Sequence, residues 1–351
     1  MAVTDETLRL IADSRRTLTQ LTDQQARALV GAWVASWDEL LPEYEASIAE
    51  LLEDAVDGKV SAAKVRANSR LRQALEVTRA NLDGLQDAAN MDIVMALPEA
   101  INLGGSTTAG VAASQLPPAH AGLVVAWDSV SPEAIAAMVE RTTQRIHSLT
   151  KPIPADTVRL MKRELIRGIS VGANPRETAR RIIKRTEGQF NGGLTRALTI
   201  ARTETLDAHR AGAAVAAKQN TDILQGWRWS CSLSGRTCGA CLSMHGREFT
   251  NDDPGPEGHP NCRCARIDIT KTWKELGFDI PEPEDTFPDA REWYEGLTPD
   301  SQADILGKAR RDLLANGDIK WEDLATKQEN PGWRPSYQET PLKDLVTAAT
   351  R

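Results

Sequence analysis

Cysteine is absent from the first 230 residues of this 351-residue chain, and aromatic residues make up only 5% of it, nine of them tryptophan. No stretch approaches the roughly 18 consecutive apolar residues that a membrane-spanning helix requires, so the sequence predicts no membrane partner. The first ten residues include Asp5, Glu6 and Arg9 and lack the apolar core of a secretory signal. These absences predict synthesis in a compartment that keeps thiols reduced.

Acidic and basic residues are distributed unevenly along the chain. The net charge is −7, yet residues 131–220 contain 16 Lys and Arg against 8 Asp and Glu. Residues 1–130 and 271–351 each carry an excess of acid. A general nucleic-acid-binding protein is normally basic overall, so any contact with DNA or with an acidic partner is expected only in the middle third of the chain.

Apolar spacing near 3.6 residues dominates the chain and predicts a mainly α protein with a small metal-stapled β module, an α+β fold. Its helical N-terminal region is expected to be elongated, with a kink or break at Pro42. The pattern divides the chain into a helical N-terminal region (1–101), a Gly/Ser/Pro-rich linker (102–130), a basic helical region (131–220), a Cys/His β module (221–270), and a C-terminal helical unit with an irregular tail (271–351).

Two helix starts are marked in the basic region, at Ser131-Pro132 and at Asn174-Pro175. The helix after Pro175 gathers five cationic residues: Arg176, Arg180, Arg181, Lys184 and Arg185. Such a stripe is a candidate surface for DNA phosphates or for an acidic partner. A solvated face of an amphipathic helix is the commoner explanation of the same pattern.

Cysteine and histidine are concentrated in one short segment. Four of the five cysteines and two of the five histidines lie between positions 238 and 264. The pattern is a CxxC pair followed by an HxxCxC element, which offers five candidate ligands: Cys238, Cys241, His259, Cys262 and Cys264. Tetrahedral Zn²⁺ takes four nitrogen or sulfur ligands, so this set is over-complete by one.

A structural Zn²⁺ is the interpretation that this spacing favours. Disulfides or redox use, and unpaired thiols, are the alternatives, but Cys231 would leave an odd count and the compartment is expected to be reducing. A catalytic metal is less favoured, because catalytic sites keep an open position and this cluster is rich in thiols. Spacing alone does not decide which four residues bind. Cys231 and His245 are expected to pack beside the site rather than to bind the metal.

The order of motifs resembles a known family. Ala201-Arg-Thr-Glu204, a Trp-bearing strand, Arg236-Thr-Cys238-x-x-Cys241 and His259-Pro-Asn-Cys262-Arg-Cys264 are similar to the Mu F-like minor head proteins of tailed phages, also called phage head morphogenesis proteins. The C-terminal segment from Gln302 to Arg310 extends the likeness, which covers roughly residues 195–345. Gly235 departs from the pattern, because many members have an acidic residue there.

The resemblance implies a structural, non-enzymatic component of the virion that assembles in the host cytoplasm. Its implied partners are the phage portal and the major capsid protein, with packaged DNA as a further one. The competing hypotheses are a DNA-binding protein and a zinc-stapled nuclease. A nuclease needs a general base near an oxygen-ligated metal, and only His245 and the pair Asp252-Asp253 could supply these groups within the module.

Overall fold

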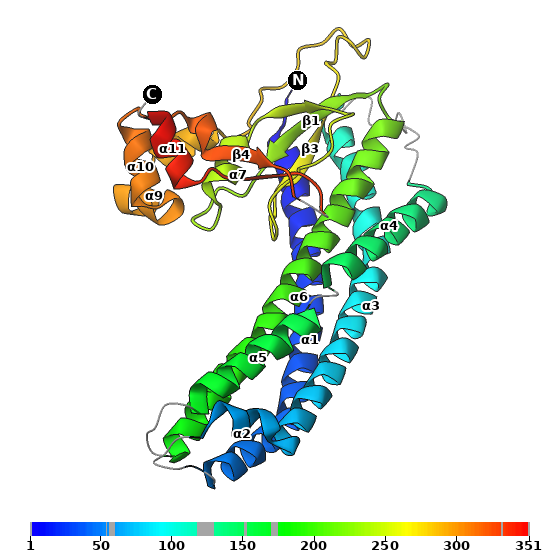
Figure 1. Cartoon of the computed structure of the whole chain (residues 1–351). Coiled ribbons are helices and arrows are strands. Elements are labelled where there is room, and N and C mark those ends of the chain that lie inside the picture. The colour runs from blue at the N-terminus through cyan, green and yellow to red at the C-terminus, as the bar shows by residue number, and fades with distance from the viewer. Residues whose placement is uncertain are drawn as a thin grey trace. The chain divides into compact units, whose positions relative to one another are not determined.

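The computed structural model describes residues 2–53, 55, 60–117, 130–150, 153–169, 175–330 and 333–349. Within them the chain is mainly helical with two small antiparallel sheets (Figure 1), which confirms the predicted fold class. None of the helices in this part of the chain has an apolar stretch long enough to cross a membrane. The chain forms two compact units: a sheet unit of Met1–Gln20, Ala96–Thr142 and Thr205–Arg351, and a helical unit of Leu21–Met95 and Thr143–Glu204.

The helical unit is built from parts of the long helices and from two short ones. Its elements come from α1 (Asp5–Glu53), α2 (Ala62–Ala67), α3 (Ser69–Ser114), α4 (Pro132–Thr150), α5 (Ile153–Ile169) and α6 (Pro175–Gln219). Their apolar faces meet in one core that includes Trp33, Trp37, Tyr44, Met161 and Phe190. The buried Tyr44 hydroxyl lies 2.7 Å from the Thr78 hydroxyl, so its polar end is satisfied inside the core.

The first sheet of the sheet unit has the strand order β2-β1-β3. It consists of β1 (Leu224–Ser230), β2 (Glu248–Thr250) and β3 (Ala265–Thr270), all antiparallel to their neighbours. The short helix α7 (Gly239–Met244) lies between β1 and β2 in the chain. Trp227 and Trp229 of β1 are fully buried and stack near Phe249 of β2, which gives this small module an aromatic core.

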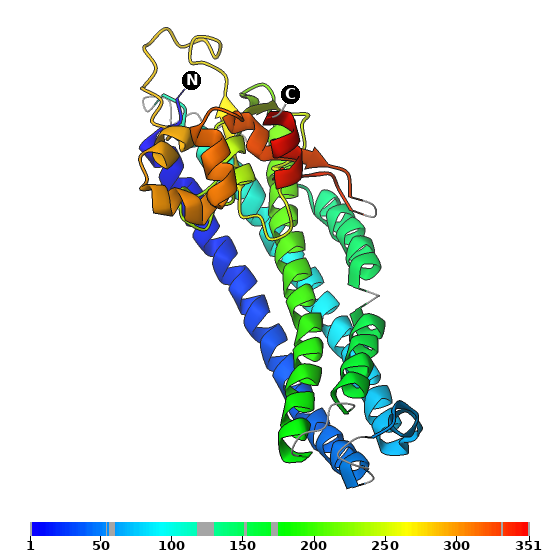
Figure 2. The same cartoon turned by 60° about the vertical axis from the view of Figure 1, so that its left-hand side comes forward.

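The C-terminal part of the sheet unit packs against the same aromatic core. Its elements are α8 (Ala290–Glu295), α9 (Pro299–Leu306), α10 (Lys308–Ala315), the 3₁₀ helix η2 (Trp321–Leu324), β4 (Ala325–Gln328), β5 (Ser336–Glu339) and α11 (Leu342–Ala349). These orange-to-red elements gather in one group in both views (Figure 2). Tyr294, Trp321 and Leu345 join Trp229 in one buried cluster.

Two glycines allow α3 and α6 to approach each other closely. A Cβ added at Gly212 of α6 would overlap the carbonyl oxygen of Ile101 and lie 2.8 Å from its carbonyl carbon. A Cβ added at Gly104 of α3 would in turn overlap the carbonyl oxygen of His209. The two helices are therefore in backbone contact, which only residues without a side chain permit.

The outer edge of β3 is bonded to a side chain instead of a strand. The amide of Gln115, just beyond the end of α3, donates to the carbonyl oxygen of Asp268 at 2.8 Å and accepts from the amide nitrogen of Thr270 at 3.4 Å. Beside it, Asp268 accepts from the Thr108 hydroxyl at 2.7 Å and pairs with Arg266 at 2.7 Å. Both side chains of this ion pair are only 2% exposed.

Three sequence predictions require correction. Pro42 does not break α1, because Leu40, Tyr44 and Ile48 on either side of it pack into one core while Pro42 itself faces solvent. Residues 102–114 of the predicted linker continue α3, since the glycines there serve helix packing. Residues 118–129 of that linker lie outside the described residues.

The third correction concerns the end of the chain. The tail predicted to be irregular contains η2, the β4–β5 hairpin and α11. Its order has a physical cause, because Leu324 and Leu345 are buried and Tyr337 packs edge-on against Trp229. The helix predicted after Pro175 continues to Gln219 as one element, α6.

Candidate metal centre

All five predicted ligands converge within the sheet unit. Cys238 and Cys241 stand at the start of α7, and the other three come from the loop that enters β3. The Nε2 atom of His259 lies 3.2 Å from the Cys238 sulfur and 3.5 Å from the Cys241 sulfur. Sulfur atoms of Cys241 and Cys262 are 3.6 Å apart. The five residues line one cavity of about 300 Å³.

The cluster consists of two overlapping groups of three ligand atoms. One group is Cys238, Cys241 and His259, and the other is Cys241, Cys262 and Cys264, with the atoms of each group within 4.8 Å of one another. Cys241 belongs to both groups. The donor set is therefore one that could hold a metal ion, and soft sulfur and imidazole donors suit Zn²⁺ among the common metals.

Local structure presents these atoms toward one another. The Cys238 sulfur caps α7 by accepting a hydrogen bond from the Cys241 amide at 3.4 Å. The Nδ1–H of His259 donates to the carbonyl of Pro260 at 2.8 Å, and Nε2 is the ring nitrogen that faces the sulfurs. A metal-binding histidine is usually oriented by such a bond at its other nitrogen.

Proton sharing within the cluster shifts the pKa values of its members. The hydrogen bond from the Cys241 thiol, and then that from His259, lowers the pKa of Cys238 to about 5. The hydrogen bond to Cys238 raises the pKa of His259 to about 9. Hydrogen bonds from Cys241 and Cys264 hold the pKa of Cys262 well below its usual range. Hydrogen bonds to neighbouring cysteines raise the pKa of Cys241 and Cys264 in turn. The network thus favours the thiolate, the form of cysteine that binds metals, at Cys238 and Cys262.

Cys231 and His245 lie beside the cluster and do not belong to either group. Burial raises the pKa of Cys231 to about 12, so it stays a thiol at neutral pH. His245 accepts from the Cys231 amide through Nδ1 at 3.0 Å, and its Nε2–H donates to the carbonyl of Pro288 at 3.0 Å. With both ring nitrogens engaged, His245 is poorly placed to act as the general base of a nuclease.

The paired acids of the nuclease hypothesis are also engaged elsewhere or exposed. The Asp253 carboxylate accepts from the amide and hydroxyl of Thr250 at 2.8 and 2.7 Å. The side chain of Asp252 is 96% exposed and lies 3.6 Å from the Lys218 ammonium. These contacts are those of a turn, and they do not assemble a second metal site next to His245.

The basic stripe of α6 is partly matched by acid. Arg180 and Lys184 line a pocket of about 750 Å³ in the helical unit together with Glu45, Glu53 and Glu187. Arg185 is exposed and Arg181 is half-buried, while the side chain of Arg176 lies outside the described part of the structure. The stripe therefore does not form a uniformly basic face.

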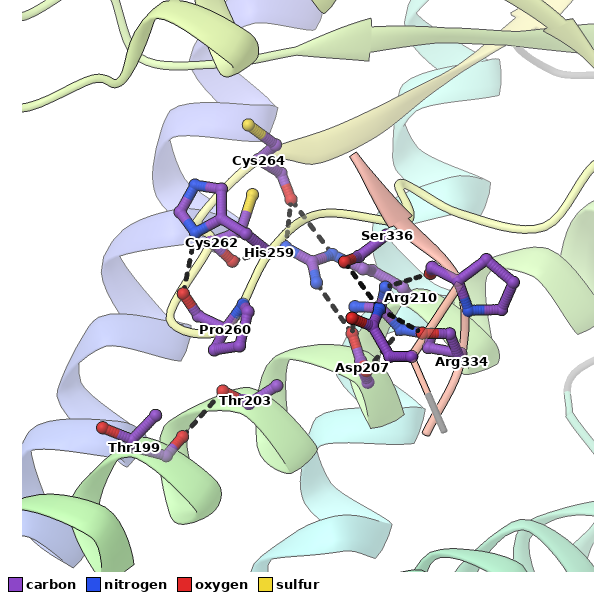
Figure 3. A network of polar contacts seen from close by, with 12 residues as sticks. Thr199, Thr203, Asp207, Arg210, His259, Pro260, Cys262, Cys264, Arg334 and Ser336 are labelled. Atoms are coloured by element: carbon purple, nitrogen blue, oxygen red, sulfur yellow. Dashed lines mark hydrogen bonds and ion pairs between the residues drawn. The ribbon is translucent and has the colours of Figure 1, made fainter. Parts of the chain in front are cut away.

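Sequence reasoning missed the residues that hold the cysteine loop. Arg210 of α6 is fully buried and donates to the carbonyls of Cys262 and Cys264 (Figure 3), while Asp207 links it to Arg334. The only signal in the sequence was the spacing of Asp207 and Arg210, three apart on one helix. Arg334 comes from the segment predicted to be irregular, so nothing local marked it.

Comparison with protein families gives one match to this chain. The family described as Phage Mu protein F like protein matches residues 160–267, a range that includes all of α6 and all five cysteine and histidine candidates. No curated protein and no solved structure matches the chain. Residues 160–267 of the chain are thus similar to the Mu F-like phage head morphogenesis proteins, the family that its motifs predicted.

Proposed function

We propose that this chain is a structural minor head protein that docks near the portal of a tailed phage and acts in head assembly or in DNA packaging and delivery. The family implies contact with other phage head components and a place in the virion. The observation that carries the proposal is the family match across the same residues that build the Cys/His cluster. Its role is structural, and the chain is not an enzyme.

The metal in this proposal is a structural Zn²⁺. Cys238, Cys241, His259, Cys262 and Cys264 are its candidate ligands, and Cys241 is the member that the two groups of three share. Zinc would hold together two loops of a module whose strands are only three to seven residues long. When bound, the ion contributes folding energy and no reaction step.

Purified virions test the proposal directly. Quantitative mass spectrometry should find a few copies per particle, in a ratio that follows the portal and not the major capsid protein. Elemental analysis of the isolated chain should find about one zinc per chain, lost in Cys241→Ser and kept in Cys231→Ser. Absence of the protein from virions, or normal particles formed without it, would refute the structural role.

A second candidate function is contact with DNA, and one surface supports it better than the α6 stripe does. A pocket of about 520 Å³ in the helical unit is lined by Ala62, Arg66, Arg159, Lys162, Arg163, Ile166 and Arg167. Among these lining residues five are cationic and none is acidic, although Arg159 is paired with Asp156 at 3.0 Å. Phosphate groups are the ligands that such a surface favours.

Salt-dependent binding to duplex DNA distinguishes the two surfaces. The double variant Lys162→Ala with Arg163→Ala should weaken binding and reduce the slope of affinity against salt by about one to two. The matched variant Arg181→Ala with Arg185→Ala on α6 should change it less. Equal losses of DNA affinity in the two double variants would mean that the α6 stripe contacts DNA as well. No binding at low salt would eliminate DNA as a partner.

A further inference from the structure

The carbonyls beside two candidate ligands are fixed by one buried arginine. Nη2 of Arg210 donates to the carbonyl of Cys262 at 2.6 Å and to that of Cys264 at 2.8 Å, and its Nε donates to the latter at 3.1 Å. The side chain of Arg210 is 6% exposed. Because three charge-assisted bonds hold two backbone groups of this loop, the positions of both thiols depend on where Arg210 points.

Arg210 is itself oriented from the C-terminal segment. Its Nη1 donates to Asp207 at 2.8 Å. The same carboxylate accepts two bonds from Arg334, Nε to Oδ2 at 2.8 Å and Nη2 to Oδ1 at 2.7 Å (Figure 3). This is the two-pronged arginine–carboxylate geometry, which fixes direction as well as distance. Arg334 precedes β5 by two residues, so the hairpin reaches the cysteine loop through Asp207.

The CxxC turn is held by the other end of the same strand. Glu339, the last residue of β5, accepts a hydrogen bond from the amide of Gly239 at 2.8 Å. Gly239 directly follows Cys238 in the chain. A Cβ added at Gly239 would lie 2.6 Å from the Leu306 side chain and 3.3 Å from the Glu339 carboxylate. The turn therefore fits closely against the C-terminal segment, and Glu339 fixes the backbone beside its first sulfur.

The segment before His259 is held by the middle of the hairpin. The amide of Tyr337 donates to the carbonyl of Glu257 at 2.8 Å, and Tyr337 forms a bridge with Gly258. Lys327 of β4 pairs with the Glu257 carboxylate at 2.8 Å. On its opposite side Gly258 has no room for a Cβ, which would overlap the sulfur of Cys262.

We infer that the β4–β5 hairpin positions the metal ligands, with Arg334 and Glu339 as its positioning residues. This inference rests on the proposed metal centre and extends it to residues beyond the family match, which ends at residue 267. The hairpin contacts the CxxC turn and the residues before His259 directly, and it reaches the Cys262–Cys264 loop through Asp207 and Arg210. Residues that orient metal ligands in this way commonly account for about 10- to 100-fold in metal affinity.

The test is the rate at which the full-length, zinc-loaded protein releases zinc to a colorimetric chelator, measured well below its unfolding temperature. Arg334→Ala should release zinc about 10- to 100-fold faster than the unchanged protein. Arg334→Lys should recover part of that loss, because lysine restores the charge but not the two-pronged bond. Arg291→Ala is the matched control, since Arg291 forms an exposed ion pair with Glu295 in the same unit.

Glu339→Ala tests the inference from the CxxC side and remains informative if Arg334→Ala does not fold. Faster release in Glu339→Ala, with Arg291→Ala unchanged, supports the positioning role. If every hairpin variant released zinc at the rate of the unchanged protein, the positioning role would be overturned, but the proposed metal centre would not. An unchanged protein that takes up no zinc would overturn the metal centre itself, and the inference with it.

Discussion

The close contact of α3 and α6 leads to a prediction in which one chemical change has opposite effects at two positions of a single helix. Gly212 and Gly188 both lie within α6. A Cβ at Gly212 would lie 2.8 and 2.9 Å from the carbonyl carbon and Cα of Ile101 and overlap its oxygen. At Gly188, which is exposed, no atom of the described residues lies within 4 Å of an added Cβ.

The magnitudes follow from these distances. Carbon atoms in contact are normally about 3.5 to 4.0 Å apart, so alanine at 212 must push the two backbones apart by most of 1 Å. Overpacking of this kind costs about 1 to 3 kcal/mol, against a gain of about 1 kcal/mol from the helix propensity of alanine. We expect Gly212→Ala to lose up to about 2 kcal/mol of unfolding free energy net, and Gly188→Ala to gain up to about 1 kcal/mol.

Urea unfolding followed by circular dichroism measures both variants, and Gly104→Ala provides a third that should behave like Gly212→Ala. The midpoint of each unfolding transition is compared with the same transition in the unchanged protein. If Gly212→Ala proved as stable as Gly188→Ala, the reasoning from backbone contact would be refuted.

Three further predictions concern the sheet unit. Asp268→Asn should lower the unfolding free energy by about 3 to 5 kcal/mol in urea titrations, because it leaves Arg266 charged and buried without its partner. Burial lowers the pKa of His209 to about 4 from 6.5, so its stabilising contribution is full above pH 6.5 and is lost as the pH falls toward 4. This contribution to the unfolding free energy is about 3 kcal/mol. In His209→Gln, the unfolding free energy should therefore depend less on pH between 6.5 and 4. Adding a chelator, or Cys241→Ser, should lower the thermal midpoint of the sheet unit by an amount that corresponds to several kcal/mol, and added zinc should restore only the chelated protein.

The candidate ligands were predictable from sequence because their chemistry is local. CxxC and HxxCxC each place ligands within one turn, and the strands on either side set the two turns opposite each other. Helix starts were equally local, since the Ser131 hydroxyl accepts from the amide of Ala134 at 3.2 Å as a cap should. Signals of this kind depend only on residues that are close in the chain, so they can be interpreted without knowledge of the tertiary structure.

What sequence could not give are the contacts between residues far apart in the chain. The glycines of 102–114 were interpreted as flexible, although Gly104 serves a contact with residue 209 that no local pattern reveals. Arg334 acts on a carboxylate 127 positions away, and so it appeared to be part of a featureless tail. The α6 stripe shows the same limit, because the glutamates that face Arg180 and Lys184 belong mostly to α1.

Gln115 has a consequence for how this protein behaves at high concentration. An open strand edge is a template on which another chain can add a strand, and this is a common route to aggregation. The Gln115 side-chain amide donates to the carbonyl of Asp268 and accepts from the amide of Thr270, as a neighbouring peptide group would. Its nitrogen also donates to the carbonyl of Val111. Its own backbone carbonyl accepts from the Trp273 indole at 2.7 Å, which anchors it there. A single side chain thus occupies two of the backbone groups on the outer edge of β3 that a strand from another copy of the chain would need for pairing.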